Sequence, residues 1–292
     1  MLDKNIVISR ARQLLKDFGI CQAPIDVDAL ALYLGFHVSR KELPDGEAGS
    51  TFERRGKKHI LINEKDGLNR QRFTILHELA HHILQLPSQH GEKVHSDELE
   101  QFKGRPKEEA LCDLFAAECL VPWQIIQPLA VQDNFTLEGL TTLSDHFQAS
   151  RSCVASRFAQ ASQDLLAYVV AEGGIIQYSI ISKKLRESKI CIKRKVPLPQ
   201  ASAACKAIQS GTNEFDVFSS ELDGNDWSNS DGAQRFVCFE EATYYAPTEQ
   251  TQSFLVFEEV EVNSISNHHQ KLDYDDELLE ELSGYPGWSK PR

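Results

Sequence analysis

Three residues within five positions have the types and spacing needed to hold a catalytic metal ion. His77 and His81 flank Glu78 in the sequence HELAH, which fits the pattern HExxH. In a helix, residues four apart lie one turn apart on the same face, so the two imidazoles can bind one ion. Glu78 then lies beside the ion, where it can act as general base toward water. These residues are typical of zinc peptidases.

The segment that carries this pattern itself predicts a helix. The run from Asn69 to Leu86 contains no Gly or Pro, and Pro87 ends it. Its apolar residues recur at helical spacing and form a packing stripe: Phe73, Leu76, Ala80, Ile83 and Leu84. Short motifs also recur by chance, so two histidines packed in a helix without a metal are the alternative reading. His82 lies about 100° round the helix from His81 and is expected at the surface or behind the site.

A third ligand is expected from a second helix, because a catalytic zinc ion takes three protein ligands and leaves one position for water. This helix is predicted over 106–121, with Pro106 as its first residue. Glu108 and Glu109 are adjacent, so only one can face the metal, and spacing alone favours Glu109 only slightly. Asp113 lies four residues after Glu109 and is placed to accept the free N–H of a bound histidine. The alternative is that Glu108 and Glu109 bind no metal and are acidic residues favoured at a helix N-terminus by the helix dipole.

Composition limits the class of protein. The chain has 292 residues, 41% of them hydrophobic, and a net charge of −12, which argues against broad nucleic-acid binding. No run approaches the roughly 20 apolar residues that span a membrane, and the N-terminus lacks the apolar core of a signal peptide. The seven cysteines are scattered and odd in number, so a disulfide framework is not expected. These features predict a cytoplasmic protein with no membrane partner.

Helices and strands alternate before the HExxH helix. Helices are predicted over 4–18 and 27–35, and a strand over 36–43. The runs TFERR and KHILIN flank Gly56 and predict a β-hairpin. The KHILIN strand, residues 58–63, is expected beside the metal site with an exposed edge that binds an extended substrate. His90 and His95 lie in a polar segment over 88–105 and are weak candidates for stabilising an oxyanion.

Two short helices are predicted over 136–147 and 150–160, joined by the turn QAS. They have the pattern of a helix-turn-helix, but Arg151 and Arg157 are balanced by Glu138 and Asp145. A helix that reads DNA is normally more basic. A role in packing, or in contacting a protein substrate, is therefore favoured, and direct DNA binding is disfavoured.

The C-terminal part is rich in predicted strands. Five β-rich runs follow residue 165, including residues 189–198, KICIKRKVPL. The segment from Lys183 to Lys195 is strongly basic, and a solvated strand edge is its plainest interpretation. An acidic partner, the acidic tail around Asp273 and Glu281, or nucleic acid are the alternatives. The tail itself is expected to be exposed or to form a short helix.

Two motifs together resemble a known family. RQRFTILHELAHHIL, followed by EEALCDLFAAECLVP, is similar to the paired helices of the ImmA/IrrE family of bacterial metallopeptidases. The resemblance is strong over residues 1–122 and weaker to about residue 160. It implies that His77, His81 and Glu109 bind zinc, that Glu78 is catalytic, and that Asp113 takes the family's Asn/Asp position. Zn²⁺ is the expected cofactor, although Mn²⁺ or Fe²⁺ also suits two histidines and one carboxylate.

The resemblance also implies a fold and a function. The fold class is α+β: a zincin-like peptidase domain over 1–122, a helix-turn-helix-like segment over 123–162, and a β-rich C-terminal domain over 163–292. In IrrE-like members, this last domain resembles a GAF sensor. The implied activity is that of a gluzincin-like metalloendopeptidase, which cleaves an XRE-type helix-turn-helix repressor and so induces stress-response or mobile-element genes. The alternative is a DNA- or repressor-binding regulator with a non-catalytic metal site.

Overall fold

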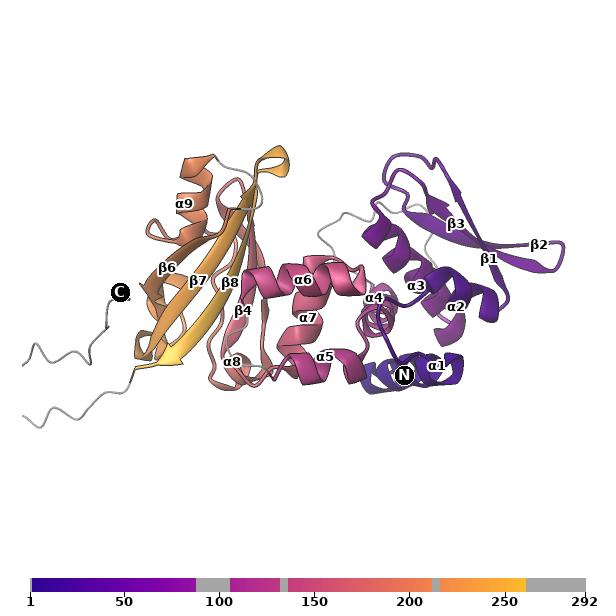
Figure 1. The fold of residues 1–292 in the computed structure, drawn as a ribbon, viewed down its shortest axis with the longest axis horizontal. Helices are drawn as coiled ribbons and strands as arrows, with labels where there is room; N and C mark the ends of the chain where they lie inside the picture. Colours follow the sequence, from indigo (N-terminus) through magenta and orange to yellow (C-terminus); the bar gives the residue numbers. More distant parts are fainter. Residues whose placement is uncertain (1, 88–105, 132–135, 212–215, 261–292) are drawn as a thin grey trace, which may run out of the picture. The chain divides into compact units, whose positions relative to one another are not determined.

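In the computed structural model, the described residues are 2–87, 106–131, 136–211 and 216–260 (Figure 1). The first half combines helices with a small sheet. Its elements are α1 (Lys4–Phe18), α2 (Val27–Tyr33), β1 (Phe36–Lys41), β2 (Gly49–Arg54), β3 (Lys57–Asn63), α3 (Leu68–Leu84) and α4 (Lys107–Leu120). The sequence predicted all seven, although Pro106 is the N-cap of α4 and not its first residue. His90 and His95 lie outside the described residues.

The small sheet has β3 at its centre. β3 pairs with β1 in parallel and with β2 in antiparallel orientation, which confirms the predicted hairpin around Gly56. The expectation that β3 offers a free edge to substrate is wrong, because both of its edges are hydrogen-bonded to neighbouring strands. The outer strands of this sheet are β1 and β2.

The sheet lies close against α3. Ile60 and Ile62 of β3 are fully buried in the core that also contains the apolar residues of α3. Gly49, at the start of β2, shows how near the two elements come: a Cβ there would lie 2.7 Å from Thr74 Cγ2 of α3. Such a separation is too short for any side chain, so only glycine fits at this point. The close packing brings β2 to the face of α3 that carries the HExxH residues.

Helix α4 is buried on most of its circumference, and its most deeply buried carboxylate has two partners. Glu118 is 0% exposed, and its carboxylate lies 2.6 Å from Nη2 of Arg157 and 2.8 Å from Nε of Arg12. The ring of Trp123 lies 5.8 Å and 5.1 Å from the two guanidinium carbons. A buried charge is tolerated when it is paired in this way. The group therefore joins α4 to α1 and to the helical segment that follows.

This helical segment contains α5 (Trp123–Leu129), α6 (Leu137–Phe147) and α7 (Arg151–Ala161). The sequence predicted α6 and α7, whose N-caps Thr136 and Ser150 bond to the backbone of the first turn. It missed α5, which is short and contains Pro128. The turn between α6 and α7 is tied to α3, because Arg72 Nε donates to the carbonyl of Gln148 and Asn69 Nδ2 to that of Ala149.

Helix α7 has little surface to offer to DNA. Gln160 is its only exposed residue, while Val154, Phe158 and others are buried among α4, α5 and the C-terminal sheet. A recognition helix needs exposed side chains along one face to enter the major groove. The structure therefore gives this helix pair a packing role and does not support its resemblance to a DNA-reading helix-turn-helix.

The C-terminal part is a five-stranded antiparallel sheet, in the order β5-β4-β8-β7-β6. The strands are β4 (Leu166–Glu172), β5 (Ile175–Ile181), β6 (Phe218–Asp223), β7 (Phe236–Tyr245) and β8 (Gln250–Glu259). The helices are α8 (Lys183–Glu187), α9 (Ala203–Ser210) and α10 (Gly224–Trp227), with 3-10 turns η1 (Ala233–Arg235) and η2 (Ala246–Thr248). The prediction of a β-rich C-terminal part in a mixed α+β protein is confirmed at this level.

One predicted strand is wrong. Residues 189–198 form only two isolated bridges, Ile192 with Ser228 and Pro197 with Ile175. Lys189 and Lys195 take left-handed backbone conformations, with φ of 60° and 57°, which interrupt an extended chain. The sequence also missed β6 and the short helices α8, α9 and α10.

Both faces of this sheet are covered. On one face, Tyr168, Val170 and Phe254 join the core that contains α3, α4 and α7. On the other face, the core contains Val169 and Leu255 together with residues of α8, α9 and α10. The described chain up to Glu259 thus forms one compact unit, and the first core runs through both halves of it.

Two adjacent carboxylates of β7 each meet the start of a helix. Glu240, 1% exposed, accepts hydrogen bonds from the amides of Ala203 and Ala204 at the start of α9, and from two serine hydroxyls. Glu241 accepts one from the amide of Leu137 at the start of α6. Helix N-termini favour anions, so both contacts stabilise the packing of helices on the sheet. None of the helices described is long and apolar enough to cross a membrane.

The ion pair at Glu118 gives a test of this packing. Arg157→Met removes one partner and leaves the buried carboxylate with Arg12 alone. The free energy of unfolding is expected to fall by about 3–5 kcal/mol, measured by urea denaturation. Glu118→Met combined with Arg157→Met is expected to restore much of the loss, because no buried charge is left unpaired and Arg12, 42% exposed, can be solvated. A loss below about 1 kcal/mol in the single variant, typical of a surface site, would contradict the structural role.

Candidate metal centre

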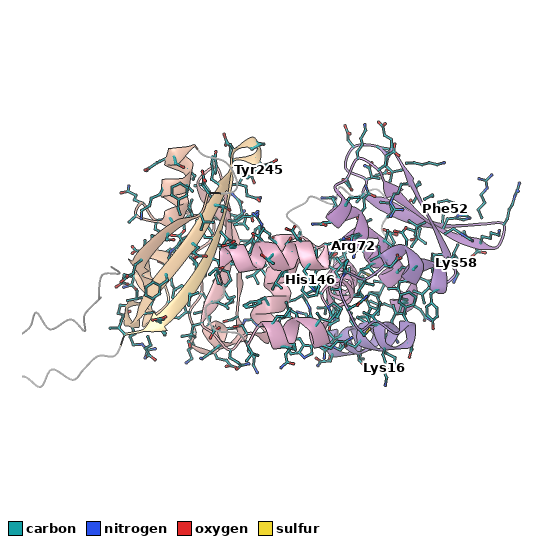
Figure 2. The ribbon with its side chains drawn as sticks, in the orientation of Figure 1. Lys16, Phe52, Lys58, Arg72, His146 and Tyr245 are labelled. Atoms are coloured by element: carbon teal, nitrogen blue, oxygen red, sulfur yellow. The ribbon has the colours of Figure 1, made fainter. Side chains whose placement is uncertain are left out.

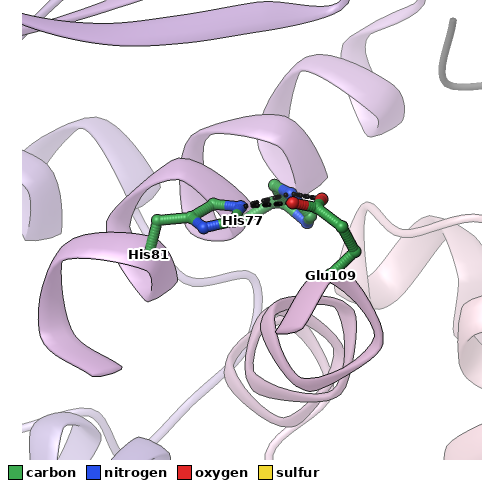
Figure 3. Close-up of side chains that lie close together, drawn as sticks. All are labelled: His77, His81 and Glu109. Carbon is green, nitrogen blue, oxygen red and sulfur yellow. Dashed lines mark hydrogen bonds and ion pairs between the residues drawn. The ribbon is translucent and has the colours of Figure 1, made fainter. Parts of the chain in front are cut away.

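Two helices bring three potential ligands together. His77 and His81 lie one turn apart on α3, and Glu109 lies in the first turn of α4 (Figure 3). One ligand atom from each residue lies within 4.8 Å of the others. In the part of the chain that the structure describes, this is the one group of three or more such residues with metal-binding geometry.

The distances suit a small tetrahedral ion. His77 Nε2 lies 3.1 Å from His81 Nε2 and 3.1 Å from Glu109 Oε2, and His81 Nε2 lies 3.4 Å from Glu109 Oε1. Ligands at about 2.0–2.1 Å from a tetrahedral zinc ion lie about 3.3 Å apart. The three side chains therefore fit the donor set of a metal with one further position open.

Asp113 lies behind His77. Its Oδ1 is 2.9 Å from His77 Nδ1, and its carboxylate is 3% exposed. A carboxylate in this position keeps the proton on Nδ1, so that Nε2 presents its lone pair to the metal. This is the arrangement that the spacing of Glu109 and Asp113 predicted.

The charges of these groups shift their proton affinities. Burial disfavours a protonated His77, but hydrogen bonds to Asp113 and Glu109 outweigh it and raise the pKa of His77 to about 10. Burial also disfavours the charged form of Glu109, but hydrogen bonds with His77 and His81 hold its pKa well below the usual range. Without a metal ion, His77 therefore favours its protonated form, and its positive charge lies beside the carboxylates of Asp113 and Glu109.

Glu78 is held at the side of this group by a residue that sequence reasoning missed. Its carboxylate is 6% exposed and accepts a 2.7 Å hydrogen bond from Thr51 Oγ1 of β2. Thr51 alternates with Phe52 along β2, so its side chain lies on the α3 face of the sheet. The sequence shows that Thr51 and Phe52 point to opposite faces of the strand, but it does not show which helix either face contacts.

The other candidates lie outside the group. His82 is exposed, and its Nε2 lies 2.8 Å from Lys58 Nζ, while its ring meets Phe36 edge-on. Glu108, the alternative to Glu109, is not among the clustered residues. The structure thus separates the two adjacent glutamates that spacing alone left open.

The part of the chain that carries this site matches a known protein family. Residues 31–159 match the Peptidase_M78 family, described as the IrrE N-terminal-like domain. This confirms the resemblance to the ImmA/IrrE family over that region. The matched region includes α3 and α4, and with them the three clustered residues, Glu78 and Asp113.

Two individual proteins are similar to parts of the chain. One is the radiation response metalloprotease IrrE of Deinococcus deserti, 30% identical over 115 residues, which are 38% of this chain and 39% of that protein. The match thus spans well under half the length of this relative. The other is the structure of a Mycobacterium tuberculosis transcriptional regulator, with a TM-score of 0.53 and 14% identity over 86% of this chain and 75% of that one. The second likeness concerns the fold alone.

Metal binding is expected to release a proton. A raised pKa means that His77 stays protonated below about pH 10 in the metal-free protein, and a metal must displace that proton. Apparent affinity should therefore rise about tenfold for each pH unit between pH 6 and 8. Calorimetric titrations with Zn²⁺ near neutral pH, in two buffers of different ionisation enthalpy, should give about one proton released per ion from this group. A heat that does not depend on the buffer would count against the protonated His77.

Three carboxylates near the start of α4, Glu108, Glu109 and Asp113, should differ in their effect on metal affinity. Asp113→Asn keeps the shape but weakens the hold on His77, and is expected to reduce Zn²⁺ affinity about 10–100-fold. Glu109→Gln removes a ligand and should cost at least as much, whereas Glu108→Gln serves as the matched control and should change nothing. Competition with a chromophoric chelator measures all three. Equal effects of the changes at 108 and 109 would reject Glu109 as the ligand.

Proposed function

We propose that this protein is a zinc-dependent regulatory endopeptidase that cleaves a protein substrate, an XRE-type helix-turn-helix repressor. The observation that carries the proposal is the convergence of His77, His81 and Glu109 with Glu78 at their side. The family match over residues 31–159 supports the reaction class. The substrate class comes from the family resemblance of the two helices.

The residues of the chain have separate roles in this reaction. His77, His81 and Glu109 would hold the metal, and Asp113 orients His77. A metal ion bound there supplies Lewis-acid activation of water and of the scissile carbonyl. Glu78 accepts the proton of the attacking water and passes it to the leaving amine. Thr51 holds one oxygen of Glu78, so the carboxylate is oriented before substrate arrives.

An extended substrate is best placed along β2. This strand lies at the edge of its sheet and carries Thr51, which touches the general base. Addition of a substrate strand to a sheet edge supplies backbone hydrogen bonds whatever the side chains. The role first assigned to the β3 edge therefore moves to β2.

Zinc is the proposed ion, with Mn²⁺ or Fe²⁺ as the alternatives that the same donors accept. Two imidazoles and one carboxylate suit all three ions. The spacings of 3.1–3.4 Å among the donors fit short bonds and low coordination, which favours zinc. Metal analysis of the purified protein separates these possibilities.

The competing function is a DNA- or repressor-binding regulator with a non-catalytic metal site. The buried α7, which exposes only Gln160, weighs against a DNA-reading role. The net charge of −12 weighs in the same direction. A regulator that sequesters a repressor without cutting it is separated from a peptidase only by a cleavage assay.

Glu78→Gln is the decisive variant. It keeps the size and leaves the metal ligands in place, but it cannot accept the proton. Cleavage of a candidate XRE-type repressor is expected to fall about 10²–10⁴-fold, followed by gel electrophoresis and mass spectrometry of the products. Zinc content should stay at the level of the unaltered protein.

The control is Glu108→Gln, which should cleave normally. If Glu78→Gln cuts as well as the unaltered protein, the catalytic assignment is wrong. If neither the unaltered protein nor Glu78→Gln cleaves the repressor but both bind it, the protein is a regulator that sequesters the repressor.

A further inference from the structure

The tip of the β2–β3 hairpin is an exposed basic surface. Arg54, Arg55 and Lys57 surround Gly56, and all four residues are exposed. Arg55 and Gly56 have φ of 53° and 72°, the two left-handed residues of a tight hairpin turn. Three cations thus lie on one tight turn, in a chain whose net charge is −12.

The cations of the tip have no ion-pair partner among the residues that the structure describes. Arg54 and Lys57 lie directly opposite each other in the strand register, a like-charge pair that destabilises a hairpin. Among the residues described, no carboxylate forms an ion pair with either of them or with Arg55. Lys58, the next cation, differs, because it contacts His82 and lies opposite Glu53. An anionic partner would relieve the repulsion at the tip.

Next to the tip is a row of rings that crosses the sheet. Phe52 is 41% exposed and stacks on His59 with ring centroids 5.2 Å apart, and His37 lies 5.6 Å beyond His59. Figure 2 labels Phe52 and Lys58 on this hairpin. The rings lie on the face of the sheet turned away from α3, the same face as Arg54 and Lys57 and the opposite one from Thr51. They offer apolar contact area beside the charges, which a peptide along the β2 edge can cover.

The tip is continuous with the proposed catalytic site. Thr51, which bonds to Glu78, lies three residues before Arg54 on β2. At about 3.3 Å per residue, the tip is roughly 10 Å from Thr51 along the strand. A chain that lies along the β2 edge with one end at the metal group therefore passes the basic tip within a few residues.

We infer that this basic tip, Arg54, Arg55 and Lys57, is a docking site for an acidic segment of a protein partner. The inference deepens the proposed function, because it takes the partner to be the substrate, with Asp and Glu residues a few positions from the cleaved bond. A nucleic acid is the less favoured occupant. Three cations on an acidic protein make a short patch, whereas phosphate backbones are bound along longer basic tracks.

The test is a binding measurement that needs no cleavage. The protein is the full chain with Glu78→Gln, and the probe is a fluorescein-labelled peptide of about 12 residues, rich in Asp and Glu, at about 50 mM salt. The hairpin variant is Arg54→Gln, Arg55→Gln and Lys57→Gln together. The matched control removes three cations of α8, Lys183→Gln, Lys184→Gln and Arg186→Gln, and so has the same net charge.

Fluorescence anisotropy should show peptide binding that the hairpin variant weakens at least tenfold and the α8 variant changes less than twofold. Raising the salt to about 500 mM should weaken binding to the unaltered hairpin strongly, because exposed charges are screened. Thermal unfolding should show the hairpin variant to be as stable as its parent or more so, since a like-charge pair is removed.

Four results would each overturn the inference. The two variants lose equal affinity, which means that net charge alone attracts the peptide. The peptide does not bind, or the hairpin variant binds it as the parent does. A single-stranded oligonucleotide of equal charge binds more tightly than the peptide and depends on the hairpin, which assigns the tip to nucleic acid. Each result stands apart from the cleavage test, since a protein that cleaves its repressor without binding the peptide keeps its peptidase function and loses only this site.

Discussion

The position of α4 is the constraint on which the proposed metal site depends. This helix is buried on nearly every side, so its few polar side chains need partners. Glu109 and Asp113 find theirs on α3, while Glu118, nine residues after Glu109, lies about 180° round the helix. There it meets Arg12 and Arg157. Paired charges on opposite sides fix the rotation of α4 about its axis, and with it the direction of Glu109.

The residues that could be predicted are those whose signal is local. HExxH, the stripe of apolar residues and the terminating Pro87 all lie within one helix, so α3 was predicted closely. The choice of Glu109 over Glu108 depended on the family pattern, because adjacent residues at a helix start have the same local signals. That Glu109 lies beside His77 and His81 is a contact between two helices. The spacing along the sequence suggests this contact but cannot establish it.

What could not be predicted depends on contacts between distant segments. KHILIN has the same strand pattern whether it lies at the edge or the centre of a sheet, and only its pairing with β1 and β2 decides. Thr51 is an ordinary strand residue until its strand is placed against Glu78. Residues 189–198 alternate like a strand, but Lys189 and Lys195 adopt left-handed conformations that their residue type does not announce.

The two carboxylates at the middle of β7 have a consequence for how the C-terminal sheet assembles. Because neighbouring residues point to opposite faces, Glu240 serves α9 and Glu241 serves α6. A slip of β7 by one residue would put Phe239 at the start of α9, or Ala242 at the start of α6. In either mispairing, one helix dipole would face an apolar side chain. The two carboxylates therefore favour the observed register of β7 electrostatically, in addition to the preference that its apolar residues supply.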